Sequence, residues 1–125
     1  MFTAFKPKTL FYLYFFLCSI SCAYFNTFYN AEQYYEEAEK IRLEKDGEAV
    51  PISAMDKYGK TIKKCQVVLD KYPDSKFVLD ATLLMAKARY YRSDFDIAIN
   101  DLKTIRGFGN NKQIEEATYW LALCK

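Results

Sequence analysis

The sequence predicts an all-α protein of about five helices, packed as antiparallel pairs in a short right-handed solenoid. Only four Gly and three Pro interrupt the 125 residues, which suits long helices joined by short turns. Apolar residues recur at intervals of three and four rather than two, so no strand is predicted. Similar blocks of small and aromatic residues surround Ala86 and Ala122, which gives a period of about 36 residues, close to the repeat length of helix-pair solenoids.

The first 21 residues have the composition of a signal peptide. A head with Lys6, Lys8 and no acidic residue precedes an apolar run from Leu10 to Ile20. This run is well short of the ~20 residues that span a bilayer, but it has the length of a signal-peptide core. Residues 1–21 are therefore predicted to be removed, and an uncleaved membrane anchor is the alternative.

The end of this run resembles the lipobox of bacterial lipoproteins, in which a small residue precedes a cysteine that becomes lipidated. Residues 19–22 read Ser-Ile-Ser-Cys, with Ser19 standing where Leu is usual. The resemblance implies that Cys22 carries the lipid and becomes the first residue of the mature chain, with residues 22–26 as the anchor segment. Ala23, in place of Asp, implies the outer membrane and a periplasm-facing protein.

Two helices are predicted in the first half of the remaining chain. The first covers Thr27–Lys45 and ends at Asp46–Gly47. After Pro51, Ser53 is the predicted N-cap of a second helix that continues to about Tyr72. The predicted inward residues are Ala31, Tyr34, Tyr35, Ala38 and Ile41 in the first helix, and Tyr58, Ile62, Cys65, Val68, Leu69 and Tyr72 in the second.

Three further helices are predicted. Ser75 caps the third, Lys76–Arg92, and a tight turn leads to the fourth, Phe95–Arg106. Gly107 is expected to end the fourth helix with a positive φ. The fifth begins near Lys112 and continues to the last residue. The predicted inward residues are Ala81, Leu84, Met85, Ala88 and Tyr91, then Phe95, Ala98, Ile99, Leu102 and Ile105, then Ala117, Trp120, Leu121 and Cys124.

The stretch Ala81–Ile105 is similar to the tetratricopeptide repeat, with Ala86, Phe95 and Ala98 at its small and aromatic positions. Together with the lipobox, the segment Tyr24-Phe25-Asn26-Thr27-Phe28-Tyr29-Asn30-Ala31 and the segment Lys71-Tyr72-Pro73-Asp74-Ser75 resemble the BamD-type (YfiO-like) outer-membrane assembly lipoproteins. The resemblance implies a tetratricopeptide-like module over 27–125 that acts as a membrane-anchored scaffold in outer-membrane β-barrel assembly. Its implied partners are β-barrel assembly components or their substrates, in addition to the membrane.

Other functions remain open from the sequence. The same repeats serve adaptors in cell division or secretion, and the chain could be a non-catalytic fragment of a larger repeat protein. In the tetratricopeptide family the first helix of each repeat lines a concave groove. The candidate partner-binding residues on that side are Asp80, Leu83, Lys87, Tyr90, Tyr91 and Tyr119. Lys87, between Leu83 and Tyr90, suits a partner segment that combines an apolar side chain with a carboxylate, and a solvated helix face is the alternative.

Composition argues against catalysis and against several ligand classes. The chain has no histidine, no glycine-rich phosphate loop and no nucleophile elbow, so no enzyme, cofactor or small-molecule substrate is predicted. Asp94 and Asp96 are interpreted as turn formers, and no metal site is predicted. From Cys22 onward acidic and basic residues balance, which gives no electrostatic reason to expect nucleic acid. Cys65 and Cys124 are predicted to be small buried hydrophobic residues rather than a disulfide.

The fifth helix is expected to lack a covering partner. Ala117, Trp120, Leu121 and Cys124 lie on its apolar side, and no second helix follows it to complete a pair. Trp120 should then expose a large apolar surface, as at an interface or a truncation. The expectation is that the natural chain continues into further repeats or that a partner helix packs there.

Overall fold

The computed structural model of the chain describes residues 6–125, apart from the side chains of residues 19–24. Within this range the chain forms five α-helices and no strand. The helices are α1 (Pro7–Glu44), α2 (Ile52–Lys71), α3 (Val78–Tyr91), α4 (Phe95–Phe108) and α5 (Asn111–Cys124). The predicted all-α fold is confirmed.

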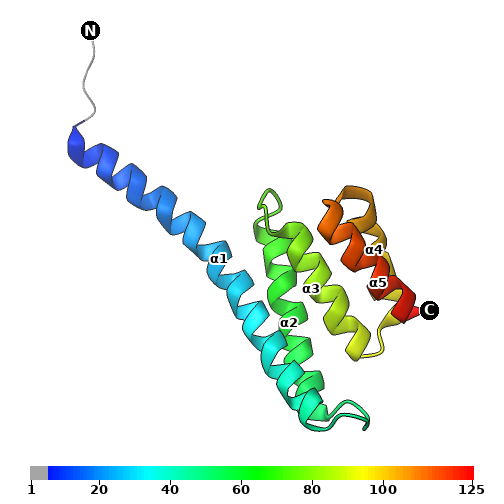
Figure 1. Cartoon of the computed structure of the whole chain (residues 1–125). Coiled ribbons are helices and arrows are strands. Elements are labelled where there is room, and N and C mark those ends of the chain that lie inside the picture. Colours follow the sequence, from blue (N-terminus) through cyan, green and yellow to red (C-terminus); the bar gives the residue numbers. More distant parts are fainter. Residues whose placement is uncertain (1–5) are drawn as a thin grey trace.

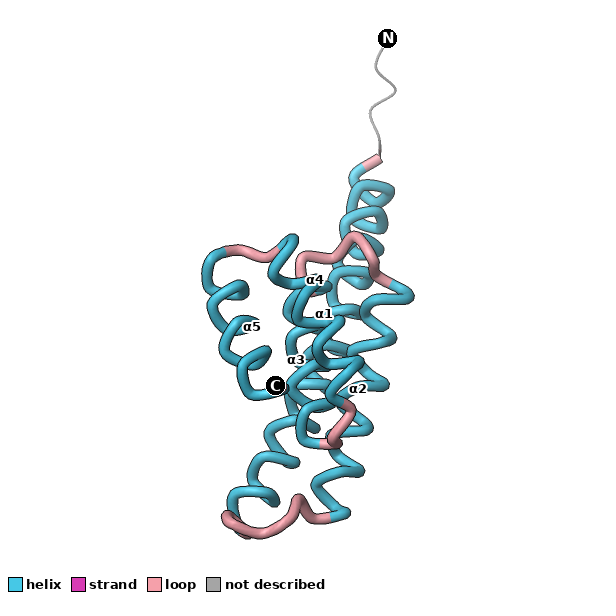
Figure 2. The backbone as a smooth tube through the Cα atoms, turned by 90° about the vertical axis from the view of Figure 1, so that its right-hand side faces the viewer, coloured by secondary structure: helices cyan, strands magenta, loops and turns pink. Residues whose placement is uncertain are grey.

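The helices pack in chain order as a short solenoid (Figures 1 and 2). Each helix contacts the next, and short connections make consecutive helices antiparallel. Contacts also join α1 to α3 and α3 to α5, whereas α2 and α4, both fully described, do not contact each other. The solenoid therefore has an inner row of α1, α3 and α5, and an outer row of α2 and α4.

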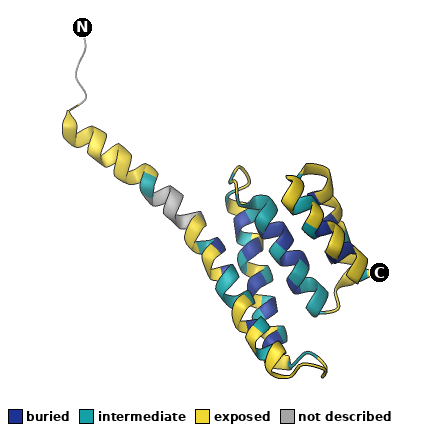
Figure 3. Cartoon of the chain, in the orientation of Figure 1, coloured by how far each residue is buried: buried dark blue, intermediate teal, exposed yellow. Residues whose placement is uncertain are grey.

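Helix α1 begins 20 residues before the predicted start of the first helix. Pro7 occupies its first turn, where the missing N–H costs no hydrogen bond, and the helix continues without interruption to Glu44. Its N-terminal part extends away from the other helices and is exposed (Figures 1 and 3). In residues 10–17 every apolar side chain is more than half exposed. The predicted boundaries at residues 21 and 26 thus fall inside one helix.

Two predicted helix ends are wrong. Ser53 does not cap α2: the cap is Pro51, without a side-chain hydrogen bond, and Ser53 lies within the first turn. Gly107 lies inside α4, which ends at Phe108, and the capping residue Gly109 has a φ of −78°. Gly109 already donates to the Ile105 carbonyl, and Asn110 forms a capping box that starts α5, so the chain leaves α4 without a left-handed residue.

Positive φ values occur elsewhere in the described residues. Gly47 in the α1–α2 connection has a φ of 86° and Ser93 in the α3–α4 turn has a φ of 64°. Both residues fall in segments that were predicted to be connections. A third predicted cap, Ser75, is also wrong: the cap of α3 is Phe77, without a side-chain hydrogen bond, and Ser75 Oγ accepts from the Phe77 N–H just before the helix begins.

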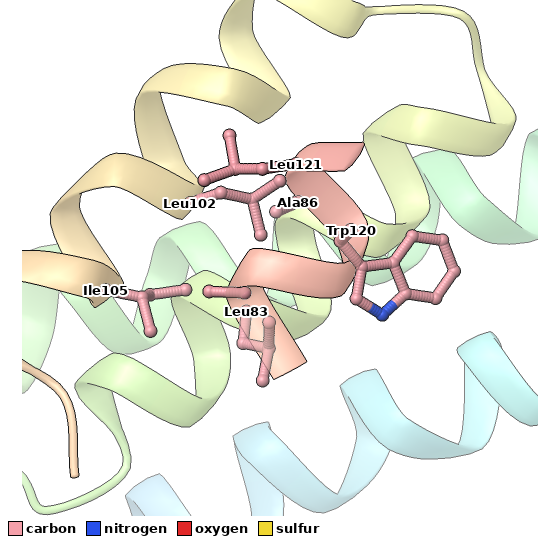
Figure 4. Packing of buried hydrophobic residues seen from close by; sticks show 7 residues of the cluster. Leu83, Ala86, Leu102, Ile105, Trp120 and Leu121 are labelled. Carbon is pink, nitrogen blue, oxygen red and sulfur yellow. The ribbon is translucent and has the colours of Figure 1, made fainter. Parts of the chain in front are cut away.

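Helix α3 is the centre of the core and is buried on two sides. Ala81 and Met85 pack against α1 and α2, while Leu83 and Ala86 pack against α4 and α5. Figure 4 shows Leu83 and Ala86 beside Leu102, Ile105 and Leu121. A single apolar stripe predicts burial on one side only, and Leu83 and Ala86 fall outside the inward stripe assigned to this helix.

The expectation that Trp120 is uncovered is wrong. Its side chain is 8% exposed and belongs to the cluster of α3, α4 and α5 (Figure 4). The indole makes edge contacts with Tyr90 and Tyr91 of α3, with ring centroids 5.3 and 5.8 Å away. The inner helix α3, rather than a following helix, covers the apolar side of α5.

Candidate functional site

A cavity of about 190 Å³ opens on the inner row, between α1, α3 and α5. Its apolar lining is Phe28, Leu83 and Leu84, and its polar lining is Glu32, Asp80, Lys87 and Glu116. We call this surface, together with Tyr35, Tyr90 and Trp120, the inner groove. It contains Asp80, Leu83 and Lys87, three of the six predicted partner-binding residues, directly at the cavity.

Lys87 is engaged within the protein rather than presented to a partner. Its Nζ lies 3.1 Å from Glu116 Oε1 in α5. The same ammonium group is 5.2 Å from the ring centroid of Tyr35 and 5.6 Å from that of Trp120. Lys87 therefore joins α1, α3 and α5 across the groove, and its charge is largely compensated.

The charge that lacks compensation in the groove is negative. Asp80 accepts a hydrogen bond from Gln113 Nε2 at 2.8 Å, which is a neutral partner. The pKa of Glu32 is raised mainly by partial burial, and further by the nearby carboxylates of Glu36 and Asp80. No cation is among the causes of that shift, because Lys87, the basic residue in the cavity lining, is paired with Glu116 instead.

Aromatic side chains line the far end of the groove. Tyr90 packs edge-on against Trp120 and Phe95, and Tyr91 stacks on the buried Tyr58 with ring centroids 5.1 Å apart. A second cavity, of about 300 Å³, opens here between the α1–α2 connection and the α3–α4 turn. Tyr90 and Tyr91 line this cavity, but both also support the fold through these ring contacts.

A polar network behind the groove was not found from the sequence. Glu39 accepts hydrogen bonds from Arg42 Nη2 at 2.7 Å and from the Tyr58 hydroxyl at 2.5 Å. The Arg42 guanidinium lies 4.3 Å from the ring centroid of Tyr91. Burial acts to raise the pKa of Glu39, but the hydrogen bonds from Arg42 and Tyr58 outweigh it and hold the pKa below its usual value.

The signal for this network was present in the spacing of α1. Glu32, Tyr35, Glu39 and Arg42 follow one another at intervals of three or four, and so share one face of the helix. Glu32 and Tyr35 on that face contribute to the inner groove, while Glu39 and Arg42 contact Tyr58 and Tyr91 behind it. Attention to apolar residues alone left this face unassigned.

The other predicted residues fall in different places. Tyr119 lies on the rim, 61% exposed, with its ring centroid 5.9 Å from that of Trp120. The Cys22 side chain lies outside the described residues. Cys65 and Cys124 have free thiols, Cys65 being buried and Cys124 half-buried, and burial raises the pKa of Cys65 to about 12.

Two negative findings apply to the part of the chain that the structure describes. No set of three or more Cys, Asp and Glu side chains there is placed to hold a metal ion. No helix in the same part combines the length and the hydropathy needed to cross a bilayer.

The fold and groove define a class: an all-α protein whose helices form a short solenoid with a mixed apolar and acidic inner surface. Comparison with family models, with curated proteins and with solved structures finds no match for this chain.

Proposed function

We propose that the chain is a lipid-anchored scaffold that faces the periplasm and binds a partner protein in its inner groove. The observation that carries this proposal is the groove itself, an apolar floor with acidic side chains between three helices. Concave surfaces on stacked helices bind extended or helical segments of other proteins. The resemblance to BamD-type lipoproteins makes outer-membrane β-barrel assembly the process in which we place it.

The groove also indicates the chemistry of the partner segment. Lys87 is paired with Glu116, so it is not the group that receives a partner carboxylate. Glu32 and Asp80 instead favour a Lys or Arg on the partner. Phe28, Leu83 and Leu84 favour an apolar side chain next to that cation. We therefore propose a basic residue flanked by apolar ones as the bound segment.

Crosslinking from intact envelopes tests the proposed process. A photoreactive residue replaces Tyr119 on the groove rim or, as the control, Gln66 on the exposed side of α2. The proposal expects a barrel-forming assembly protein to crosslink at position 119 and not at 66. A different envelope protein at 119 would favour division or secretion, and equal crosslinking at both positions would contradict the groove assignment.

A charge reversal tests the proposed chemistry. Glu32→Lys should weaken the crosslink at position 119 several-fold, because it places a cation where the partner's cation binds. Asp56→Lys, an equivalent reversal at an exposed position of α2, is the matched control. If both reversals weaken binding equally, general charge rather than the groove governs it.

A further inference from the structure

The two ends of the helix bundle differ in composition. The α2–α3 and α4–α5 connections lie at the end from which α1 extends, and the α1–α2 connection and α3–α4 turn lie at the other (Figure 1). The first end carries Lys71, Lys76, Arg106 and Lys112 against Asp70, Asp74 and Asp80. The second carries Glu44, Asp46, Glu48, Asp94 and Asp96 against Lys45, Arg92 and Lys125. We call these the basic end and the acidic end.

Aromatic side chains are exposed at the basic end. Phe25 and Tyr29, one turn apart on α1, are 53% and 49% exposed and stack with ring centroids 6.4 Å apart. Phe25 also lies 6.2 Å from Phe77 in the α2–α3 connection, and Lys76 Nζ lies 5.3 Å from the Phe77 ring centroid. Phe108, the last residue of α4, is 79% exposed. Exposed aromatic and basic residues together are typical of membrane-interface surfaces.

The sequence position of Cys22 connects this surface to the proposed anchor. Position 22 precedes Phe25 by three residues on α1, and Phe25 and Tyr29 lie one turn apart. The backbone of α1 is helical through position 22 and on to the first buried side chain, Phe28. Six residues of helix span only ~9 Å, and no flexible linker intervenes. A lipid at position 22, two helical turns or fewer from Phe25 and Tyr29, would hold these exposed rings and the bundle close to the bilayer.

We infer that the basic end is a membrane-docking surface that fixes the orientation of the module on an anionic bilayer. This inference rests on the proposed lipid anchor at Cys22. Phe25, Tyr29 and Phe108 enter the headgroup region, and the four basic residues bind the anionic headgroups. The acidic end then points away from the membrane, because bilayer and acidic end carry the same sign of charge.

Collisional quenching measures this orientation. The mature lipoprotein is placed on vesicles of phosphatidylethanolamine and phosphatidylglycerol that contain a nitroxide-headgroup lipid. A fluorophore is attached at Asn111→Cys on the basic end or at Ala49→Cys on the acidic end, in a Cys124→Ser background that leaves only the buried Cys65 and the lipidated Cys22. The two ends are separated by roughly 20 Å, the length of a 14-residue helix, so quenching at 111 should exceed quenching at 49 several-fold.

The contribution of Phe25 and Tyr29 to the membrane orientation can be tested against a matched control. Phe25→Ser with Tyr29→Ser should reduce the difference between the two positions, whereas Tyr119→Ser, which removes an equally exposed aromatic ring from α5, should preserve it. Equal quenching at 111 and 49 in the parent, for a protein that floats with the vesicles, would overturn the docking surface and leave the anchor intact. A protein that does not float with the vesicles would overturn the anchor and the inference together.

Discussion

Helix α1 contains two regions with different apolar patterns and opposite behaviour. In residues 10–17 every side chain is apolar and exposed, and this part of the helix extends away from the bundle (Figure 3). In residues 28–44 apolar and charged side chains alternate with helical spacing, and Phe28, Ala31 and Ala38 are buried against the neighbouring helices. The second region is held by packing and by the hydrogen bonds of Glu39, whereas the side chains of the first are more than half exposed.

The difference shows that periodicity, rather than hydrophobicity, determines which part of a helix joins a core. A stripe with a period near 3.6 gives one side that can pack and one that water can solvate. A segment that is apolar on all sides has no side for water, and suits a membrane or a targeting signal. The comparison supports treating the two regions of α1 as parts with different roles.

The largest expected effect separates these two regions directly. Ala38→Asp places an unpaired carboxylate among Ala54, Tyr58 and Ala88, and should destabilise the module by on the order of 3 kcal/mol or more. Leu13→Asp, in the exposed region, should leave the unfolding midpoint unchanged. Denaturant unfolding followed by circular dichroism measures both. Similar losses from the two substitutions would mean that both regions of α1 belong to the folded core.

A smaller effect is expected from the network that holds the second region. Tyr58 is fully buried, and Tyr58→Phe removes the hydroxyl that donates to Glu39, at a cost of about 1–2 kcal/mol. Tyr119→Phe makes the same chemical change at an exposed ring and should have no measurable effect. Unfolding free energies from urea titrations compare the pair, and equal values would show that the network contributes nothing to the fold.

The acid dependence of stability follows from the lowered pKa of Glu39. Because the folded protein holds this carboxylate below its usual pKa of 4.5, its contribution is present above that pH and is lost as the pH falls through the folded value. The parent should therefore be more stable than Glu39→Gln at neutral pH, and the difference should vanish in acid. Thermal unfolding over a pH series measures it, and a difference that persists in acid would contradict the assignment.

Substitution of Glu32 should change the folding stability in the opposite direction from substitution of Glu39, and by the smallest amount. The pKa of Glu32 is raised, so the folded state is destabilised by the charged form above that pKa and relieved as the pH falls. Glu32→Gln should stabilise the module slightly at neutral pH, by about 0.5 kcal/mol or less because solvent screens this partly exposed group. The same substitution should weaken crosslinking at position 119. Loss of both stability and binding would make Glu32 a structural residue.

Much of the fold was predictable from local pattern. The all-α class, the order of the helices and the burial of Ala98, Leu102 and Ile105 follow from spacing alone. The errors come from tertiary effects and from the detail of helix ends. Trp120 is covered by α3 because inner helices contact one another, which a pairwise view of repeats omits. Gly107 remains within α4 because the next helix start, the capping box of α5, lies only at Asn110.

The candidate site was predictable in position but not in charge. Asp80, Leu83 and Lys87 do line the inner groove, as their spacing predicts. The pairing of Lys87 with Glu116 depends on how α5 packs beside α3, and residues 29 positions apart give no local signal of it. Because Lys87 is paired with Glu116, we propose that the partner supplies a cation rather than the carboxylate expected from the sequence.

The most direct test of this account is the mass of the N-terminal peptide of the protein isolated from membranes. If the two regions of α1 have different fates, the peptide begins at Cys22 and carries the added mass of acyl chains. Cys22→Ala, with the rest of the chain unchanged, should remove that added mass. A peptide that begins at Met1 in the parent protein would show that both regions of α1 remain together, and would contradict the proposed lipid anchor.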